Sequence, residues 1–232
     1  MKNAIVLCSG GLDSVTTANY VKKKLGYKKI TILFFNYGQK TILQERKFSK
    51  KCAEKLNAEF IEINLGWLGK ISNSLINKSG KIKKIKRVDL RDTKKESEKF
   101  YVPCRNTIFL TYALAFAESL FFKKKEISDI FVGFKNEGKE SYPDTTKEFI
   151  KQMNKLSEIS CKRRFRIIAP FIKKDKEDII SLGKKLGIDF EETFSCYVGK
   201  NMHCGFCLAC KLRQEGFYWA NEKDPTKYYN EK

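Results

Sequence analysis

Short apolar runs alternate with helical periodicities along most of this chain. Runs rich in β-branched and aromatic residues predict buried strands at residues 4–8, 30–35, 59–63, 127–133 and 165–170. Apolar residues at helical spacing predict helices over residues 14–25, 43–56, 107–122, 147–159 and 176–186. Strands that alternate with helices form parallel sheets covered on both faces. The pattern therefore predicts a doubly wound α/β fold.

Two segments interrupt this alternation. Residues 67–100 are polar, basic and irregular, which is typical of an insertion. After Gly187 the pattern gives way to a cysteine-rich loop and a last helix around residues 208–220. We therefore predict a main domain over residues 1–187, with the insertion, and a small C-terminal segment over residues 188–232.

The composition indicates a folded protein that does not span a membrane. The chain has 232 residues, of which 42% are hydrophobic and 13% aromatic, and this excludes global disorder. No apolar run approaches the roughly 20 residues that a membrane-spanning helix needs. The opening residues are interrupted too quickly for a signal peptide. We therefore expect a cytoplasmic protein that does not contact a membrane.

Basic residues outnumber acidic residues by 47 to 27, which gives a formal charge of +20. That charge is compatible with an acidic partner. Most of the basic residues are lysines spread over the whole chain, as on a solvated surface, so nucleic acid is not the expected partner. The densest cluster, Lys81–Arg87, suits either a contact with an acidic protein partner or a mobile loop.

A hexapeptide joins the first predicted strand to the first predicted helix: Ser9-Gly10-Gly11-Leu12-Asp13-Ser14. Glycines let a backbone approach a phosphate, and the N–H groups at a helix start favour anionic oxygens. The two serines add hydroxyl donors, and Asp13 suits a magnesium ion or the helix N-terminus. An ordinary capped turn is the alternative, but the complete hexapeptide favours nucleotide binding. It lacks the Gly-Lys-Ser or Gly-Lys-Thr of a Walker motif.

Four of the eight cysteines lie within fifteen residues, namely Cys196, Cys204, Cys207 and Cys210. Four thiolates suit tetrahedral zinc, and a closed set of four favours a structural site. Buried or redox cysteines and a [4Fe–4S] cluster are the alternatives. The single histidine, His203, is either a substitute ligand or, as we expect, a residue beside the ligands or exposed to solvent.

The hexapeptide resembles the PP-loop of the N-type ATP pyrophosphatases. Five further segments match one branch of them: Asn36-Tyr37-Gly38-Gln39, Val102-Pro103-Cys104-Arg105-Asn106, Tyr142-Pro143-Asp144, Ser195-Cys196-Tyr197 and Leu212-Arg213. Together with the four cysteines, they make the chain similar to the QueC family of 7-cyano-7-deazaguanine synthases, from about residue 4 to residue 217.

This resemblance implies a Rossmann-like fold of the adenine nucleotide alpha hydrolase type with a small C-terminal zinc-binding subdomain. It also implies a ligase that cleaves ATP to AMP and pyrophosphate and activates 7-carboxy-7-deazaguanine as an acyl-adenylate. Ammonia then gives the amide, and a second activation gives the nitrile. Structural zinc and magnesium are the implied cofactors, and a homodimer is expected.

The matching motifs imply roles for individual residues. ATP would be bound by Ser9, Gly10, Gly11, Leu12, Asp13, Ser14, Tyr37 and Gln39, and the deazapurine by Arg105, Asn106, Tyr142 and Asp144. Asp13, Arg105 and Lys176 would act in catalysis, since guanidinium binds carboxylates and phosphates and Lys176 can neutralise pyrophosphate. A solvated lysine, a helix-capping aspartate and a core tyrosine are the structural alternatives.

The chain departs from the family around the substrate loop. The usual Asp-Phe-Ser-Gly-Tyr-Pro-Asp-Cys-Arg is Gly138-Lys139-Glu140-Ser141-Tyr142-Pro143-Asp144-Thr145-Thr146 here, and Cys104 replaces a glycine. Three alternatives to the nitrile synthase therefore stay open. One is an antiphage-defence enzyme that joins the activated deazapurine to a protein amine. The others are a tRNA-modifying PP-loop enzyme and a non-catalytic module that binds zinc and nucleotide.

Overall fold

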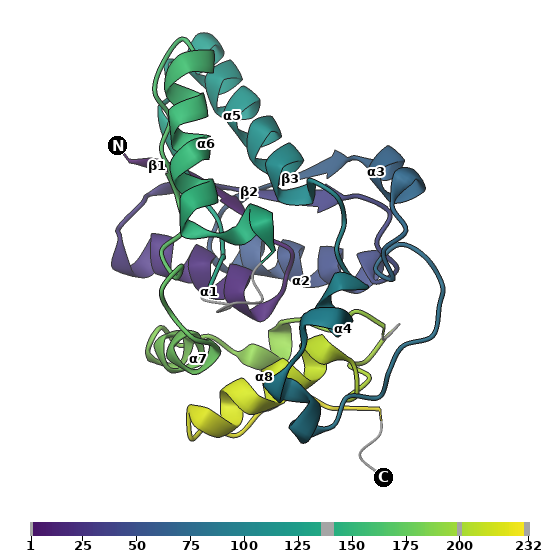
Figure 1. Ribbon diagram of the computed structural model, residues 1–232. Helices are drawn as coiled ribbons and strands as arrows, with labels where there is room; N and C mark the ends of the chain where they lie inside the picture. Colours follow the sequence, from purple (N-terminus) through teal and green to yellow (C-terminus); the bar gives the residue numbers. More distant parts are fainter. Residues whose placement is uncertain (1, 136–141, 199–200, 230–232) are drawn as a thin grey trace.

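A five-stranded parallel sheet forms the centre of the computed structural model, which describes residues 2–135, 142–198 and 201–229 (Figure 1). The strand order is β3-β2-β1-β4-β5. The chain moves outward from β1 to β3 and then returns to the other side of β1, so a topological switch point lies between β1 and β4. The predicted doubly wound α/β fold is confirmed. The strands are β1 (Asn3–Leu7), β2 (Lys29–Asn36), β3 (Glu59–Asn64), β4 (Ser128–Phe131) and β5 (Ile167–Ile168).

Helices cover both faces of this sheet. In Figure 1, α5 and α6 lie over one face, and α1 and α2 lie over the other. No helix of the described residues has the length and apolarity that crossing a membrane requires. The longer helices are α1 (Leu12–Asn19), its π-helical continuation η1 (Tyr20–Lys24), α2 (Ile42–Lys55), α5 (Arg105–Lys124), α6 (Lys147–Ser160), α7 (Lys176–Lys185) and α8 (Leu208–Trp219). The shorter ones are α3 (Gly66–Ile71), η2 (Arg87–Arg91), α4 (Lys94–Glu98), η4 (Pro143–Thr145) and η5 (Phe190–Glu192).

The central strand β1 divides the apolar core into two layers. Its side chains alternate between the faces, so Ala4 and Val6 join the core beneath α1 and α2, while Ile5 joins the core beneath α5. All three are at most 2% exposed. This burial on both faces explains why the strand appears in the sequence as a continuous apolar run.

The edge strand β5 is much shorter than the predicted residues 165–170. It pairs with β4 through Ile167 and Ile168 alone. Side chains of α6 satisfy the neighbouring backbone groups instead. Asn154 exchanges two hydrogen bonds with the backbone of Ile167, at 2.8 and 2.9 Å, and Ser157 does the same with Phe165, at 2.9 and 3.2 Å. The free edge of the sheet is therefore covered by polar side chains of a helix.

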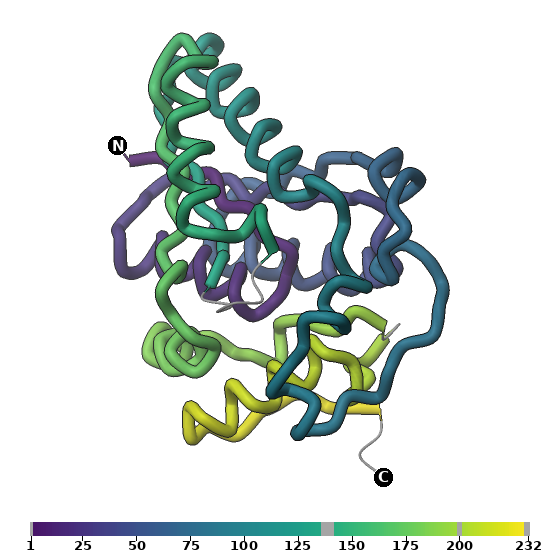
Figure 2. Tube along the Cα trace, viewed as in Figure 1, coloured from purple at the N-terminus to yellow at the C-terminus, as the bar shows by residue number. Residues whose placement is uncertain are grey.

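The basic insertion is more ordered than its composition suggests. It contains α3, η2 and α4, and it buries Ile85 and Phe100 in the protein. The Ile85 N–H donates to the Phe206 carbonyl at 2.9 Å, which ties the Lys81–Arg87 cluster to the cysteine-rich segment. Figure 2 shows the insertion running down to the C-terminal part of the chain. The cluster therefore lies on a packed segment, not on a free loop.

Close contact between α7 and α8 brings the C-terminal helix against the main domain. At their crossing, a Cβ on Gly216 would overlap the side chain of Lys176 and lie 2.9 Å from Ile180 Cδ1. Only glycine leaves room for this approach. Because Lys176 is the first residue of α7, the same contact determines where its side chain lies.

We expect Gly216→Ala to lower the free energy of unfolding by about 1–3 kcal/mol, because the added methyl must displace Lys176 and Ile180. Urea titration followed by circular dichroism measures the change. Gly66→Ala is the matched control, since its Cβ would meet a single side-chain oxygen, Asn64 Oδ1, at 3.3 Å. Equal stability of the two variants would contradict this account of the helix crossing.

Candidate functional site

A cavity of about 310 Å³ opens at the carboxyl ends of β1, β2 and β4. This is where ligands bind in open α/β sheets, at the switch point between strands. The loop that follows β1, the first residues of α5 and α7, the segment 194–197 and residues of α2 and α8 contribute to its wall. Its charged side chains are four cations, Arg105, Lys135, Lys176 and Arg213, and two carboxylates, Asp13 and Glu45. The cavity therefore suits an anionic ligand.

The predicted phosphate loop packs tightly at its glycines. Gly10 has φ +78°, and a Cβ there would lie 2.7 Å from the Glu45 carbonyl oxygen. Ser14 Oγ donates to the Gly11 carbonyl at 2.9 Å and lies 3.4 Å from Ser9 Oγ. Gly11 precedes α1 as its N-cap, without a side-chain cap. The first N–H groups of this helix are therefore available to an anion.

An ion pair joins this loop to α7. Lys176 Nζ lies 2.5 Å from Asp13 Oδ2. The other carboxylate oxygen, Asp13 Oδ1, is buried and has no hydrogen-bond partner among the described residues. A buried carboxylate oxygen without a donor is a ligand that suits a hard cation such as Mg²⁺. The pair thus places a cation, Lys176, and a candidate metal ligand, Asp13, where a polyphosphate could meet both.

Tyr37 and Gln39 follow β2 and are both predicted to contact the nucleotide, but their side chains lie in different places. Tyr37 lines the cavity, and burial raises its pKa to about 12. Gln39 is buried, accepts from the Tyr37 N–H at 2.9 Å and donates to the Phe35 carbonyl at 2.9 Å. Its side chain therefore holds the turn that follows β2.

Arg105 and Asn106 begin α5 and line the cavity. The Arg105 guanidinium lies 5.7 Å from the centre of the Tyr37 ring. Burial by itself lowers the pKa of Arg105. The interactions with Tyr37, Tyr197 and Asp144 have the larger combined effect, so the pKa of Arg105 is raised. The arginine is thus a fixed cation beside an aromatic wall.

Asp144 and Tyr142 lie behind the start of α5, and neither is part of the cavity wall. The Asp144 carboxylate accepts from the Asn106 N–H at 3.0 Å and from Asn106 Nδ2 at 3.2 Å. Tyr142 Oη donates to the Ser97 carbonyl at 2.6 Å. Residues Gly138–Ser141 of the same motif lie outside the described residues. The described part of the motif therefore holds Asn106 and α4.

Glu45 is a cavity carboxylate that the sequence analysis does not identify. Thr41 Oγ1 donates to its Oε1 at 2.5 Å, and Gln39 Nε2 donates to its Oε2 at 3.1 Å. Burial raises the pKa of Glu45, whereas the two hydrogen bonds and the charge of Arg105 lower it. The available signal was its position one helical turn after Thr41, near the predicted ATP residue Gln39.

The four clustered cysteines form a compact group of buried sulfurs. All four Sγ atoms lie within 4.8 Å of one another, and the Cys196–Cys207 and Cys204–Cys210 pairs are both 3.9 Å apart. Hydrogen bonds from the other three thiols, that of Cys204 first, lower the pKa of Cys196. The cluster could hold a metal ion such as zinc.

His203 lies beside this cluster without belonging to it. The residue is buried, and its Nε2 accepts from the Ser195 N–H at 3.0 Å. Burial, and then the charge of Arg213, lowers its pKa to about 4, so the ring is neutral near pH 7. The expectation of a position beside the ligands agrees with this contact, but solvent exposure was wrong, because Phe194 and Tyr228 enclose the ring.

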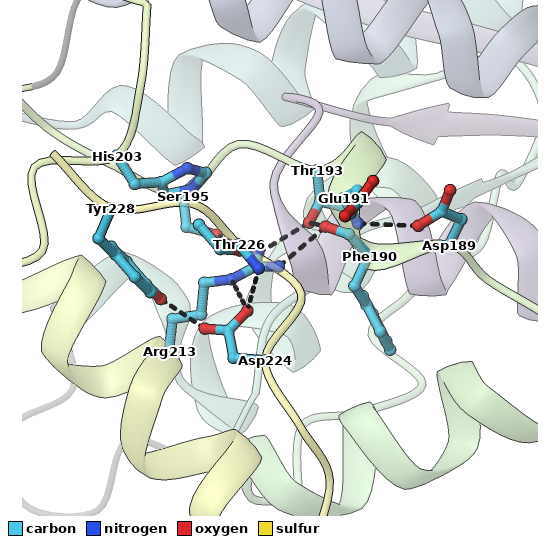
Figure 3. Close-up of polar contacts among 10 residues, drawn as sticks. All are labelled: Asp189, Phe190, Glu191, Thr193, Ser195, His203, Arg213, Asp224, Thr226 and Tyr228. Carbon is cyan, nitrogen blue, oxygen red and sulfur yellow. Dashed lines mark hydrogen bonds and ion pairs between the residues drawn. The ribbon is translucent and has the colours of Figure 1, made fainter. Parts of the chain in front are cut away.

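A buried arginine joins the end of the chain to the cavity wall (Figure 3). Arg213 is 1% exposed and donates to the Phe190 carbonyl at 2.9 Å, Thr193 Oγ1 at 2.7 Å and Asp224 Oδ1 at 3.3 Å. Tyr228 Oη donates to the other Asp224 oxygen at 2.5 Å. Because the guanidinium is planar and has five N–H donors, one residue can hold these separate segments together.

Comparison with known proteins identifies relatives of the chain. The family described as "Queuosine biosynthesis protein QueC" matches residues 3–221. The chain belongs to the QueC family. A 7-cyano-7-deazaguanine synthase of Methanosphaera stadtmanae is 39% identical over 229 residues, 97% of each chain. That of Clostridium kluyveri is 36% identical over 246 aligned residues and covers 100% of both chains.

Solved structures give a more distant likeness. The NMN synthetase of Francisella tularensis aligns with a TM-score of 0.43 and 15% identity, over 95% of this chain and 84% of that one. Membership in the QueC family therefore rests on the sequence comparisons, and the fold on the sheet described above.

We expect Arg213→Met to lower the free energy of unfolding by about 3–5 kcal/mol, because it leaves Asp224 without its buried partner. Urea titration measures the loss. Arg87→Met is the matched control. Arg87 pairs with Glu215 at the surface, so its removal leaves no buried charge without a partner. If both variants lose the same stability, the Arg213 network does not hold the C-terminal segment.

Proposed function

We propose that this QueC-family protein makes 7-cyano-7-deazaguanine from 7-carboxy-7-deazaguanine, using ATP to activate the carboxylate. One observation carries the proposal: the predicted phosphate loop and four cations line the same cavity, so a polyphosphate and a carboxylate can meet there. The relatives named 7-cyano-7-deazaguanine synthase, which align along almost the whole chain, support this substrate.

ATP would bind with its phosphates on the loop Ser9–Ser14. The free N–H groups at the start of α1 stabilise the phosphate oxygens, and Lys176 neutralises the pyrophosphate that leaves. Asp13 would hold Mg²⁺ through its unpartnered oxygen, and the ion would offset negative charge on the phosphates. Tyr37 would close the nucleotide side, and Gln39 would keep the turn after β2 in place.

The deazapurine carboxylate would attack the α-phosphorus of ATP, which forms an acyl-adenylate and releases pyrophosphate. Arg105 would orient the carboxylate and balance its charge, because a guanidinium binds two oxygens at once. Ammonia would displace AMP to give the amide, and a second activation by ATP would remove the amide oxygen to give the nitrile. Asn106 would contact the purine-like ring, Asp144 would hold that asparagine, and Tyr142 would support the adjacent wall.

The changed residues Thr145 and Thr146 have structural tasks, which favours the nitrile synthase over the conjugating enzyme. Thr145 is 8% exposed, and its hydroxyl donates to the Tyr142 carbonyl at 2.9 Å. Thr146 caps α6 by accepting from the Phe149 N–H at 3.0 Å. These contacts indicate repacking of the loop and give no support to an opening wide enough for a protein chain.

We infer that the cysteine cluster binds one structural zinc ion. Four sulfurs about 2.3 Å from a tetrahedral ion lie about 3.8 Å apart, close to the 3.9 Å of both sulfur pairs. A [4Fe–4S] cluster places each thiolate on a different iron and so needs a wider set. With four protein ligands the ion would have no open position for substrate, and it would stabilise the wall that contains Ser195 and Tyr197. A cytoplasmic homodimer and an acidic protein partner stay predictions.

We expect AMP and pyrophosphate, and no ADP, when the protein is incubated with Mg²⁺, ATP and 7-carboxy-7-deazaguanine. Asp13→Asn and Ser14→Ala should each lower the rate about 10²-fold, because both remove groups from the phosphate end. Chromatography of the nucleotides and mass spectrometry of the amide and nitrile measure the reaction. Asp92→Asn, in the surface insertion, serves as the control. Formation of ADP, or AMP without amide and nitrile, would contradict the proposal.

We expect elemental analysis of the purified protein to find one zinc ion per chain. Cys204→Ser should remove the metal and lower the melting temperature, since a structural zinc site contributes folding free energy directly. Cys161→Ser, outside the cluster, should change neither quantity. A brown protein that contains iron and acid-labile sulfide would identify a different metal group.

A further inference from the structure

Glu45 is a carboxylate of the cavity to which the reaction outlined above gives no task. It lies in the first turn of α2, and each of its oxygens accepts one hydrogen bond, from Thr41 and from Gln39. An ionised carboxylate accepts about four hydrogen bonds, so each oxygen can accept one more. Both oxygens therefore have capacity for a ligand that offers N–H donors.

The orientation of this carboxylate is fixed before any ligand binds. The Gln39 side chain that donates to Glu45 is itself held by the backbone of Phe35 and Tyr37, at 2.9 Å each. Gln39 is 2% exposed, and Thr41 is 4% exposed. An acceptor held by buried neighbours loses little conformational freedom on binding, which favours both affinity and selectivity.

Flat aromatic surfaces line the same cavity. Phe35 and Phe109 stack with their ring centres 4.1 Å apart. Both rings line the cavity together with Glu45. A planar heterocycle could rest on these rings with its polar edge toward the carboxylate.

We propose that Glu45 binds the guanine-type edge of the deazapurine, accepting from its ring N–H and its exocyclic amine. The assignment rests on the proposed function. Two adjacent donors on the base match the two oxygens of the carboxylate. Adenine fits less well, because its single amine lies beside a ring nitrogen whose lone pair would face the carboxylate. Glu45 would therefore select the deazapurine over the base of ATP.

The other carboxylates near the cavity differ from Glu45 in partner or position. Asp13 is paired with the cation Lys176, and Asp144 accepts from Asn106 and is not part of the cavity wall. Of the acidic side chains that line the described part of the cavity, Glu45 alone is held by neutral donors on both oxygens. This difference is what directs the guanine-type edge to Glu45.

Steady-state kinetics of Glu45→Gln test the assignment, with pyrophosphate release as the readout. We expect the KM for 7-carboxy-7-deazaguanine to rise about 10- to 100-fold, because an amide NH₂ replaces one acceptor, while the KM for ATP changes less than twofold. Glu54→Gln, on the exposed side of the same helix, should keep both values. An unchanged KM for the acid, or a raised KM for ATP instead, would overturn the assignment.

A substrate analogue without the exocyclic amine gives a second test. Its deciding comparison uses the wild-type protein and so does not depend on whether a variant folds. The wild-type protein should show a kcat/KM at least 10-fold lower for this analogue than for the acid, and Glu45→Gln should show a smaller difference. A wild-type protein that converts both equally well overturns the role of Glu45 but leaves the proposed function intact. A wild-type protein that releases no pyrophosphate with the acid removes both.

Discussion

The phosphate loop is enclosed by backbone on several sides, and the rest of the site depends on this constraint. A Cβ on Gly10 would lie 2.7 Å from the Glu45 carbonyl oxygen, and a Cβ on Gly133 would lie 3.1 Å from Ser14 N. The Gly10 carbonyl in turn accepts from the Phe194 N–H at 2.8 Å. Helix α2, the end of β4 and the C-terminal segment thus meet at one short loop. Any shift of one of these elements therefore moves the N–H groups at the start of α1.

This arrangement links the cysteine-rich segment to the predicted phosphate loop. Phe194 donates to the loop and directly precedes Ser195 and Cys196, so the cysteine cluster and the loop are joined through one stretch of backbone. Arg213 holds the same stretch from behind through Phe190 and Thr193. A structural metal at the cysteine cluster would stabilise one wall of the cavity.

The sequence predicts those parts of the structure that depend on residues close together in the chain. It misses those that depend on contacts between segments far apart in the chain. The strands, the phosphate loop and the cysteine cluster are each recognisable within a short segment, because turn chemistry and ligand spacing act over a few residues. The length of β5 depends on Asn154 and Ser157 of a neighbouring helix. The positions of Asp144 behind Asn106 and of Glu45 in the cavity depend on packing between elements far apart in the chain, which no local pattern encodes.

Charged groups of both signs line the cavity, and each is held by different neighbours. At the phosphate end, Lys176 cancels one oxygen of Asp13 and leaves the other for a cation. On α2, neutral donors hold the Glu45 carboxylate, and each of its oxygens keeps capacity for one more N–H donor. Burial raises the pKa of Glu45, and the charge of Arg105, which lies beside Tyr37, offsets part of that effect. A ligand with a carboxylate on one side and N–H donors on the other would satisfy both Arg105 and Glu45, whereas a polyphosphate would be attracted by the first and repelled by the second. Under the proposed function, the charges at Arg105 and Glu45 would therefore favour the deazapurine over ATP at this part of the site.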